Sequence, residues 1–409
     1  MAKSGKISLY VFWMLYIIFL LQYCFVTMGI SAFGYYDEFL SMLFLIVLAL
    51  KIVANHFTIR ISLPGMITLM MYFIFIIAGL AGNILHANQT FIYILLDILT
   101  SSKMILGLIG AKIFFPNGLG EEKSIGLLKI TKIYIVVLFV LAVHDWFMTP
   151  FFQVGYDNAI LGLASKYIYL MYSNPTYLAA YAIAAMIVLI YIDEFHGSWP
   201  FIVMDSVVIV LTTRSKAWGF LCFSLLIYLI TNKSSSVKSI KNRIAMVVPL
   251  GIATVLFVAM DKIIVYFFTP THYSPRSILL QEGISLAKKY FPFGNGFGTY
   301  CSVAAITTGR GLELLPYNKT AYYDAFWGCM TGQFGFLGTA AFVGLIGVLL
   351  VDSMSLIQFD KKSWYAAIFA FAYLLIASLG ETSFFSQYSV CFGFMIGLAL
   401  TCKRRKNVE

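Results

Sequence analysis

Long apolar runs constrain this chain more than any other feature of its sequence. Stretches of about 20 residues with few charges recur along its 409 residues, separated by short polar segments. A helix needs about 20 apolar residues to cross the roughly 30 Å hydrocarbon core of a bilayer. The composition agrees, since 61% of the residues are hydrophobic and only 11% are charged, whereas soluble domains carry about 25% charged residues. A water-soluble globule, a disordered chain and a fibrous repeat are therefore excluded.

The apolar runs are continuous, whereas the strands of outer-membrane barrels alternate apolar and polar residues. The sequence therefore predicts an all-α polytopic membrane protein. No internal repeat and no linker rich in Pro or Ser divides it, so residues 1–409 are expected to form a single transmembrane domain. Twelve spans are predicted, at residues 7–30, 38–54, 63–85, 91–114, 130–149, 175–193, 200–213, 217–231, 244–266, 325–351, 363–380 and 385–402.

An even number of spans places both termini on the same side of the membrane. Lys3 and Lys6 near the start and the basic residues 403–406 near the end assign that side to the cytoplasm, because Lys and Arg gather on cytoplasmic loops. The first run lacks a small-residue cleavage site and is expected to be retained. The net charge of +10 then reflects membrane orientation and anionic lipid, and nucleic acid is not expected as a partner.

One long segment, residues 267–324, lies between the ninth and tenth spans and is expected to face outward. It contains a candidate amphipathic helix at residues 276–291, which is expected to lie in the interface plane. The apolar face carries Leu279, Leu286 and Tyr290, and the polar face carries Glu282, Ser285 and Lys289. The following Gly-Asn-Gly-Phe-Gly segment, residues 294–298, does not follow a strand. It therefore predicts a tight turn toward the membrane and not a nucleotide-binding loop.

The turn at residues 212–216 joins two short spans and carries two cations. The apolar part of the seventh span, residues 201–213, has 13 residues and covers only about 20 Å. Arg214 and Lys216 are therefore expected at or below headgroup depth, where a charge indicates function. A guanidinium binds phosphate oxygens bidentately, so a lipid-linked phosphate or pyrophosphate is the predicted ligand. Snorkelling of both side chains to the outer headgroups is the alternative.

Two further outward arginines are candidates for the same anion. Arg276 follows Pro275 at a predicted helix start, where free backbone N–H groups favour anions; a solvated first-turn residue is the alternative. Arg310 lies among glycines, and a solvated loop position is the simpler interpretation for it. The six cysteines form no CxxC or His-containing cluster, so neither a metal site nor a disulfide framework is expected.

Asp324 lies directly before the tenth span, after Tyr322 and Tyr323. Its carboxylate is predicted either to cap the helix or to take a proton from a sugar hydroxyl. Other acids on the outer side compete for the second role. They are Asp37, Glu38, Asp157, Glu282, Glu313 and Glu381.

Lys103 lies halfway along the fourth span. Asp97, six residues away, is on a different face of the same helix, so Asp205 on the seventh span is the expected partner. A buried ion pair between helices is the favoured interpretation, and a proton or ion pathway is the alternative. Asn174 with Pro175 predicts a helix N-cap followed by Pro at the first helical position.

Taken together, these features resemble the bacterial O-antigen polymerase (Wzy-type) family and the related O-antigen ligases. The matching segments are Asp37 and Glu38, residues 174–179 (Asn-Pro-Thr-Tyr-Leu-Ala), residues 213–217 (Thr-Arg-Ser-Lys-Ala), Arg276 in the large outer loop, residues 294–298, and Asp324 eleven residues before Gly335, with Gly338 after it. Each motif alone is short. The resemblance depends on the order of the motifs along the chain and on the side of the membrane predicted for each.

The resemblance implies a GT-C-like glycosyltransferase of the bacterial inner membrane, with its active site on the periplasmic side. Such an enzyme needs no metal, cofactor or nucleotide sugar. Its donor and acceptor are oligosaccharides linked to undecaprenyl pyrophosphate, joined with inversion. A chain-length regulator and membrane lipids are further candidate partners.

The resemblance also implies roles for individual residues. Arg214 corresponds to the essential periplasmic arginine and Arg276 to the loop arginine, and both are expected to stabilise the leaving pyrophosphate. Ligases have a His-Asn pair where this chain has Asp324 and Ala325, which argues against a ligase. The remaining residues expected to bind pyrophosphate or glycan are Lys216, Arg310, Asn174 and Tyr323. The alternatives are a ligase, a flippase for lipid-linked oligosaccharides, and a lipid-binding scaffold.

Overall fold

The structure is a computed structural model. It describes residues 2–54, 56, 62–86, 89–152, 154–160, 163–172, 174–193, 195, 197–232, 275–309 and 325–406. The structure is 80% helical, and the described residues contain one two-stranded sheet. The expected all-α fold is therefore confirmed.

Eleven of the twelve predicted spans coincide with helices, and the ninth, residues 244–266, lies outside the described residues. The long helices are α1 (Ala2–Thr27), α2 (Tyr36–Ala54), α3 (Leu63–His86), α4 (Phe91–Phe114), α5 (Glu121–Phe147), α6 (Pro175–Asp193), α7 (Trp199–Leu211), α8 (Ser215–Asn232), α10 (Pro275–Lys289), α12 (Phe326–Met354), α13 (Lys361–Ser378) and α14 (Ser389–Lys406). Shorter elements are η1 (Ser31–Tyr35), α11 (Val303–Thr307) and η4 (Ser355–Gln358).

Six helical segments are long and apolar enough to cross a membrane, in the part of the chain that is described. They lie in α1, α3, α4, α5 and α6, and in the stretch Phe326–Gln358 that begins with α12. Length and composition therefore identify a membrane protein.

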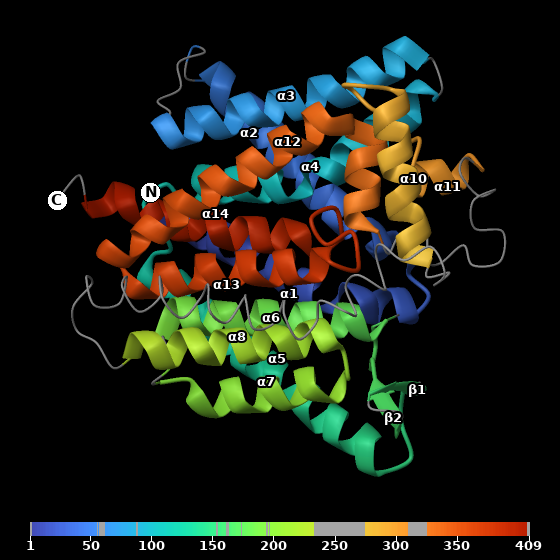
Figure 1. Ribbon diagram of the computed structural model, residues 1–409. Coiled ribbons are helices and arrows are strands. Elements are labelled where there is room, and N and C mark those ends of the chain that lie inside the picture. Colours follow the sequence, from blue (N-terminus) through green and yellow to red (C-terminus); the bar gives the residue numbers. More distant parts are fainter. Residues whose placement is uncertain are drawn as a thin grey trace.

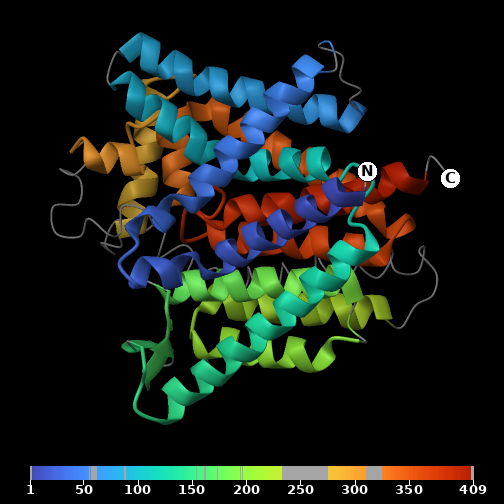
Figure 2. The same ribbon diagram turned by 180° about the vertical axis from the view of Figure 1, so that it is seen from behind.

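The long helices lie side by side, and both chain termini lie at the same end of the bundle (Figure 1). The opposite end carries α10, α11 and the small sheet, and α10 runs across the direction of the other helices. The view from behind shows the same separation (Figure 2). The shared location of the termini agrees with an even number of crossings.

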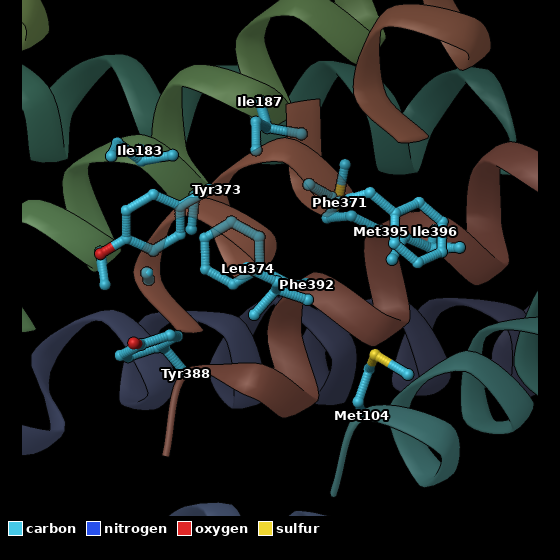
Figure 3. Close-up of a cluster of buried hydrophobic side chains, with 14 of the residues drawn as sticks. Met104, Ile183, Ile187, Phe371, Tyr373, Leu374, Tyr388, Phe392, Met395 and Ile396 are labelled. Carbon is cyan, nitrogen blue, oxygen red and sulfur yellow. The ribbon is translucent and has the colours of Figure 1, made fainter. Parts of the chain in front are cut away.

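The centre of the bundle is formed by α6 and α13, which are apolar on all sides. A helix with apolar residues around its whole circumference belongs inside a protein, and nearly every residue from Leu178 to Ile190 is buried. Figure 3 shows Ile183 and Ile187 of α6 facing Tyr373 and Leu374 of α13. Around this centre, α14 packs against α4 and α13, and α4 packs against α2.

The segment after α10 is inserted into a break in α12. Gly335 interrupts the helix with φ +61°, and the freed backbone groups bond to the inserted segment: Leu337 N–H donates to Pro292 O (3.1 Å) and Gly296 N–H to Gln333 O (2.8 Å). Asn83 of α3 holds the same segment with two bonds to the Phe297 backbone, of 2.9 and 2.8 Å. The predicted tight turn is thus a buried wedge, whose bonds satisfy the broken helix.

The amphipathic helix is present as α10, Pro275–Lys289, close to the predicted range. Its predicted faces are confirmed in part, since Leu279 is fully buried while Ser285 and Lys289 are exposed. Leu286 and Tyr290 of the apolar face and Glu282 of the polar face are all half-buried. Gly283 faces Gly328 of α12 so closely that a Cβ on either residue would overlap the other helix. These glycines let α10 lie directly on the backbone of α12.

A β-hairpin that the sequence analysis did not predict joins α5 to α6. It consists of β1 (Val154–Ile160) and β2 (Leu163–Ile168), paired antiparallel with Gly155 opposite Tyr167. Lys166 of β2 donates from Nζ to the carbonyl oxygens of Asp145 (2.5 Å) and Trp146 (2.9 Å) at the end of α5. A lysine at that place also complements the negative end of the helix dipole, so it fastens the hairpin to α5.

Candidate functional site

Lys216 and Arg276 meet at the end of the bundle that carries α10. Lys216 lies in the first turn of α8, and Arg276 lies in the first turn of α10. Their charged heads both face Gly380, in the segment between α13 and α14. A Cβ on Gly380 would lie 3.1 Å from Lys216 Nζ and 3.4 Å from Arg276 Cζ. The absence of a side chain at this glycine therefore leaves room for two cations from helices far apart in the sequence. We call this region the cationic basin.

Glu381 supplies a carboxylate to the cationic basin. Its Oε1 lies 3.8 Å from Lys216 Nζ, and the side chains are 16% and 24% exposed, respectively. The hydroxyl of Tyr388 donates a hydrogen bond to the same Oε1 at 2.9 Å. The basin is therefore partly sheltered from solvent, which strengthens its electrostatic interactions relative to those on an open surface.

Arg214 lies just before α8, at the turn that the sequence analysis singled out. Its carbonyl oxygen accepts from Ala217 N–H (3.0 Å) and Trp218 N–H (3.1 Å), so it opens the helix. Its guanidinium Cζ lies 5.1 Å from the centroid of the Tyr167 ring, a cation–π contact. The Nε atom is buried and has no hydrogen-bond partner among the described residues. Because a buried donor of this kind favours a bound acceptor, Arg214 is suited to hold an anion.

The charges of the four residues described above favour an anionic ligand. Arg214, Lys216 and Arg276 bring three positive charges, and Glu381 brings one negative charge. Two of the cations lie in the first turns of α8 and α10, where unpaired backbone N–H groups add partial positive charge. Among the described residues, no group of three or more His, Cys, Asp and Glu is placed to hold a metal ion.

The structure describes only part of the predicted site. Asp324, Tyr323 and Arg310 lie outside the described residues. Asn174 is exposed, and its Oδ1 accepts from Thr176 N–H at 2.9 Å, which confirms the predicted N-cap of α6. Its predicted contact with substrate stays a prediction.

The predicted buried ion pair of Lys103 is confirmed, but the predicted partner, Asp205, is wrong. Lys103 Nζ pairs with the carboxylates of Asp37 and Glu38 of α2, the latter at 2.6 Å. The reason is packing: α4 lies against α2, whereas α7, which carries Asp205, lies against α5 and α6. Asp205 is fully buried, and neither of its carboxylate oxygens has a partner in the described part of the chain.

Two aromatic residues of this region were not singled out from the sequence. Tyr388 holds Glu381, and Tyr167 holds Arg214. Glu381 was only one of several competing acids. A Gly-Glu pair directly before the last span was the available signal, because the glycine leaves space for the cations that the neighbouring carboxylate attracts.

Comparisons with known proteins do not assign a family. No protein-family model matches the sequence, and no curated protein matches it.

Proposed function

We propose that this protein is a polysaccharide polymerase of the O-antigen type, which joins oligosaccharide repeat units carried on undecaprenyl pyrophosphate. The observation that carries the proposal is the meeting of Lys216 and Arg276 at Gly380, beside Glu381. A lipid-linked pyrophosphate needs cations to stabilise its charge, and an inverting glycosyl transfer is assisted by a base such as a carboxylate. The cationic basin supplies both.

In this proposal the cations act mainly on the leaving group. When the glycosidic bond to the diphosphate breaks, negative charge develops on the diphosphate oxygens. Donors already in place stabilise such charge without reorganising, which is commonly the largest contribution to catalysis. Arg276 and Lys216 would hold the diphosphate, and Arg214 would add a planar fork of N–H donors. Asp324 stays a predicted base or cap.

We further propose twelve spans, a GT-C-like architecture and the bacterial inner membrane as location. Both termini would be cytoplasmic and the active site periplasmic. The arrangement of the bundle supports this orientation, because α10, which carries Arg276, and the termini lie at opposite ends (Figure 1). The basic residues near both termini support it as well.

The decisive experiment uses purified protein in detergent or vesicles with undecaprenyl-pyrophosphate-linked repeat units and no metal or nucleotide. We expect a ladder of products on a gel from the wild-type protein. Arg276→Ala should lose the ladder, whereas Lys288→Ala, a matched control at the exposed end of the same helix, should retain it. No product from active wild-type membranes would overturn the proposal.

The same variants in cells separate the alternative functions. A dead polymerase leaves a single repeat unit on the surface, whereas a dead flippase leaves none. A ligase would instead transfer the glycan to a different lipid acceptor in the purified reaction. Arg276→Ala should therefore give surface glycan of one repeat unit, detected with an antibody against the glycan.

A further inference from the structure

We infer that Glu381 is the general base that takes the proton from the acceptor hydroxyl. The inference rests on the proposed polymerase function and names the residue that acts on the acceptor. Its starting point is the place of Glu381 in the chain, directly after the glycine at which Lys216 and Arg276 meet.

The chemistry requires the base to lie close to the cations. In the donor, a single oxygen atom joins the anomeric carbon to the diphosphate. A side chain that activates the attacking hydroxyl must therefore lie within a few ångströms of the groups that bind the diphosphate. Glu381 Oε1 is 3.8 Å from Lys216 Nζ, and this distance meets the requirement.

Tyr388 fixes the orientation of the Glu381 carboxylate. The Tyr388 ring is fully buried and packs against Tyr373 and Phe392, with ring centroids 5.8 Å away in both cases. Its hydroxyl donates to Glu381 Oε1 at 2.9 Å. A carboxylate has about four acceptor positions, so it accommodates Tyr388, Lys216 and a substrate hydroxyl together. The buried Tyr388 ring therefore fixes the direction in which the Glu381 carboxylate points.

Four other acids of the described residues, all buried or half-buried, already have structural roles. Glu381 is the acid that lies beside the two cations. Asp37 and Glu38 pair with Lys103, Asp97 accepts from Gly298 N–H at 2.8 Å, and Asp145 accepts from the backbone N–H groups of Phe151 (2.9 Å) and Phe152 (3.2 Å).

The reaction balances with Glu381 as the base. The acceptor oxygen forms a bond to the anomeric carbon, and the bond from that carbon to the diphosphate oxygen breaks. The electron pair leaves with the diphosphate, and the acceptor proton passes to Glu381. As Glu381 becomes neutral, its attraction for Lys216 falls. Lys216 can then stabilise the charge that develops on the diphosphate.

The test compares Glu381→Gln with wild-type protein in the purified polymerisation reaction. The amide keeps the shape and an acceptor for Tyr388 but cannot take a proton. We expect kcat to fall by about 10² to 10⁴-fold with the donor KM within about threefold of wild type. Glu122→Gln, at an exposed glutamate of α5, is the matched control and should keep wild-type turnover. Binding of undecaprenyl pyrophosphate by Glu381→Gln checks that the variant is folded.

A structural role of Glu381 makes a different prediction. If Glu381 only neutralises Lys216, Glu381→Gln should change the donor KM and the affinity for undecaprenyl pyrophosphate, with kcat kept within about threefold of wild type. That outcome would overturn the inference. A loss of turnover in Asp324→Asn, together with an active Glu381→Gln, would assign the base to Asp324 and overturn the inference. Failure of the polymerase proposal is distinct, because then the wild-type protein itself forms no ladder.

Discussion

The aromatic ring of Tyr167 lies across Gly155, its partner on the opposite strand of the hairpin, so closely that a Cβ on Gly155 would overlap the ring. The guanidinium of Arg214 lies over the same ring, 5.1 Å from its centroid. A cation–π contact holds a guanidinium by its charge and does not require a hydrogen bond from its N–H groups. The hairpin therefore contacts Arg214 through the Tyr167 ring.

Gly155→Val should weaken the hold on Arg214, because the valine side chain displaces the Tyr167 ring. Cation–π contacts contribute about 0.5–2 kcal/mol, so we expect the Kd for undecaprenyl pyrophosphate to rise by about 2- to 30-fold. Tyr167→Phe keeps the ring and should bind as wild type, whereas Tyr167→Leu should match Gly155→Val. Equal binding by all three variants would show that the ring does not position Arg214.

Arg214→Lys and Arg276→Lys test whether the ligand needs two parallel hydrogen bonds. An ammonium group is a compact charge and cannot bind a phosphate bidentately. We expect both variants to retain some polymerisation but to form shorter glycan chains than wild type, as read from gel ladders. Full chain length in Arg214→Lys would mean that charge alone suffices at that position.

Lys103→Met should destabilise the fold, since it leaves the carboxylates of Asp37 and Glu38 without their cation in a buried place. Removal of one partner from a buried ion pair costs about 3–5 kcal/mol. The melting temperature in detergent should therefore fall clearly. Lys51→Met, at an exposed lysine of α2, is the control and should melt as wild type. Asp37→Asn combined with Lys103→Met should recover part of the loss.

Gly335→Ala should separate the wedge from α12. Its φ of +61° is unfavourable for alanine, and a Cβ there would lie within 2.7 Å of the Phe293 carbonyl carbon. We expect a loss of about 1–3 kcal/mol in the free energy of unfolding together with reduced polymerisation. Gly347→Ala is the matched control on the same helix, because nothing lies within 4 Å of the added methyl group. That variant should gain up to about 1 kcal/mol.

Hydropathy and helical periodicity predicted most of this fold. The ends of α3, α4 and α6 lie within a residue or two of the predicted spans, because an apolar run of fixed length permits few alternatives. The small hairpin was missed, since its two short strands carry no comparable signal. Its role, to place the Tyr167 ring beside Arg214, becomes clear only in the three-dimensional structure.

The candidate site was predicted less completely. The short seventh span predicted that Lys216 lies at headgroup depth, and its place at a helix start made Arg276 a candidate. That the two meet at Gly380 depends on how α8 and α10 pack. The predicted partner of Lys103 was wrong for the same reason. The spacing along one helix excludes Asp97 as a partner, but it does not show which other helix lies next to Lys103. Pairings between distant segments follow from tertiary packing, which a single sequence does not contain.

The wedge in the break of α12 has a consequence for how a ligand is bound. It ties the C-terminal end of α10 to α12 through backbone hydrogen bonds and to α3 through the side chain of Asn83. Nearer to Arg276, Gly283 of α10 lies directly against α12, so the helix that bears Arg276 is held at both places. The conformational entropy of α10 is therefore lost once, when the chain folds. It is not lost again each time a glycolipid binds to Arg276. Because the binding site is already ordered before the ligand arrives, little of the binding free energy is offset by rearrangement of the protein.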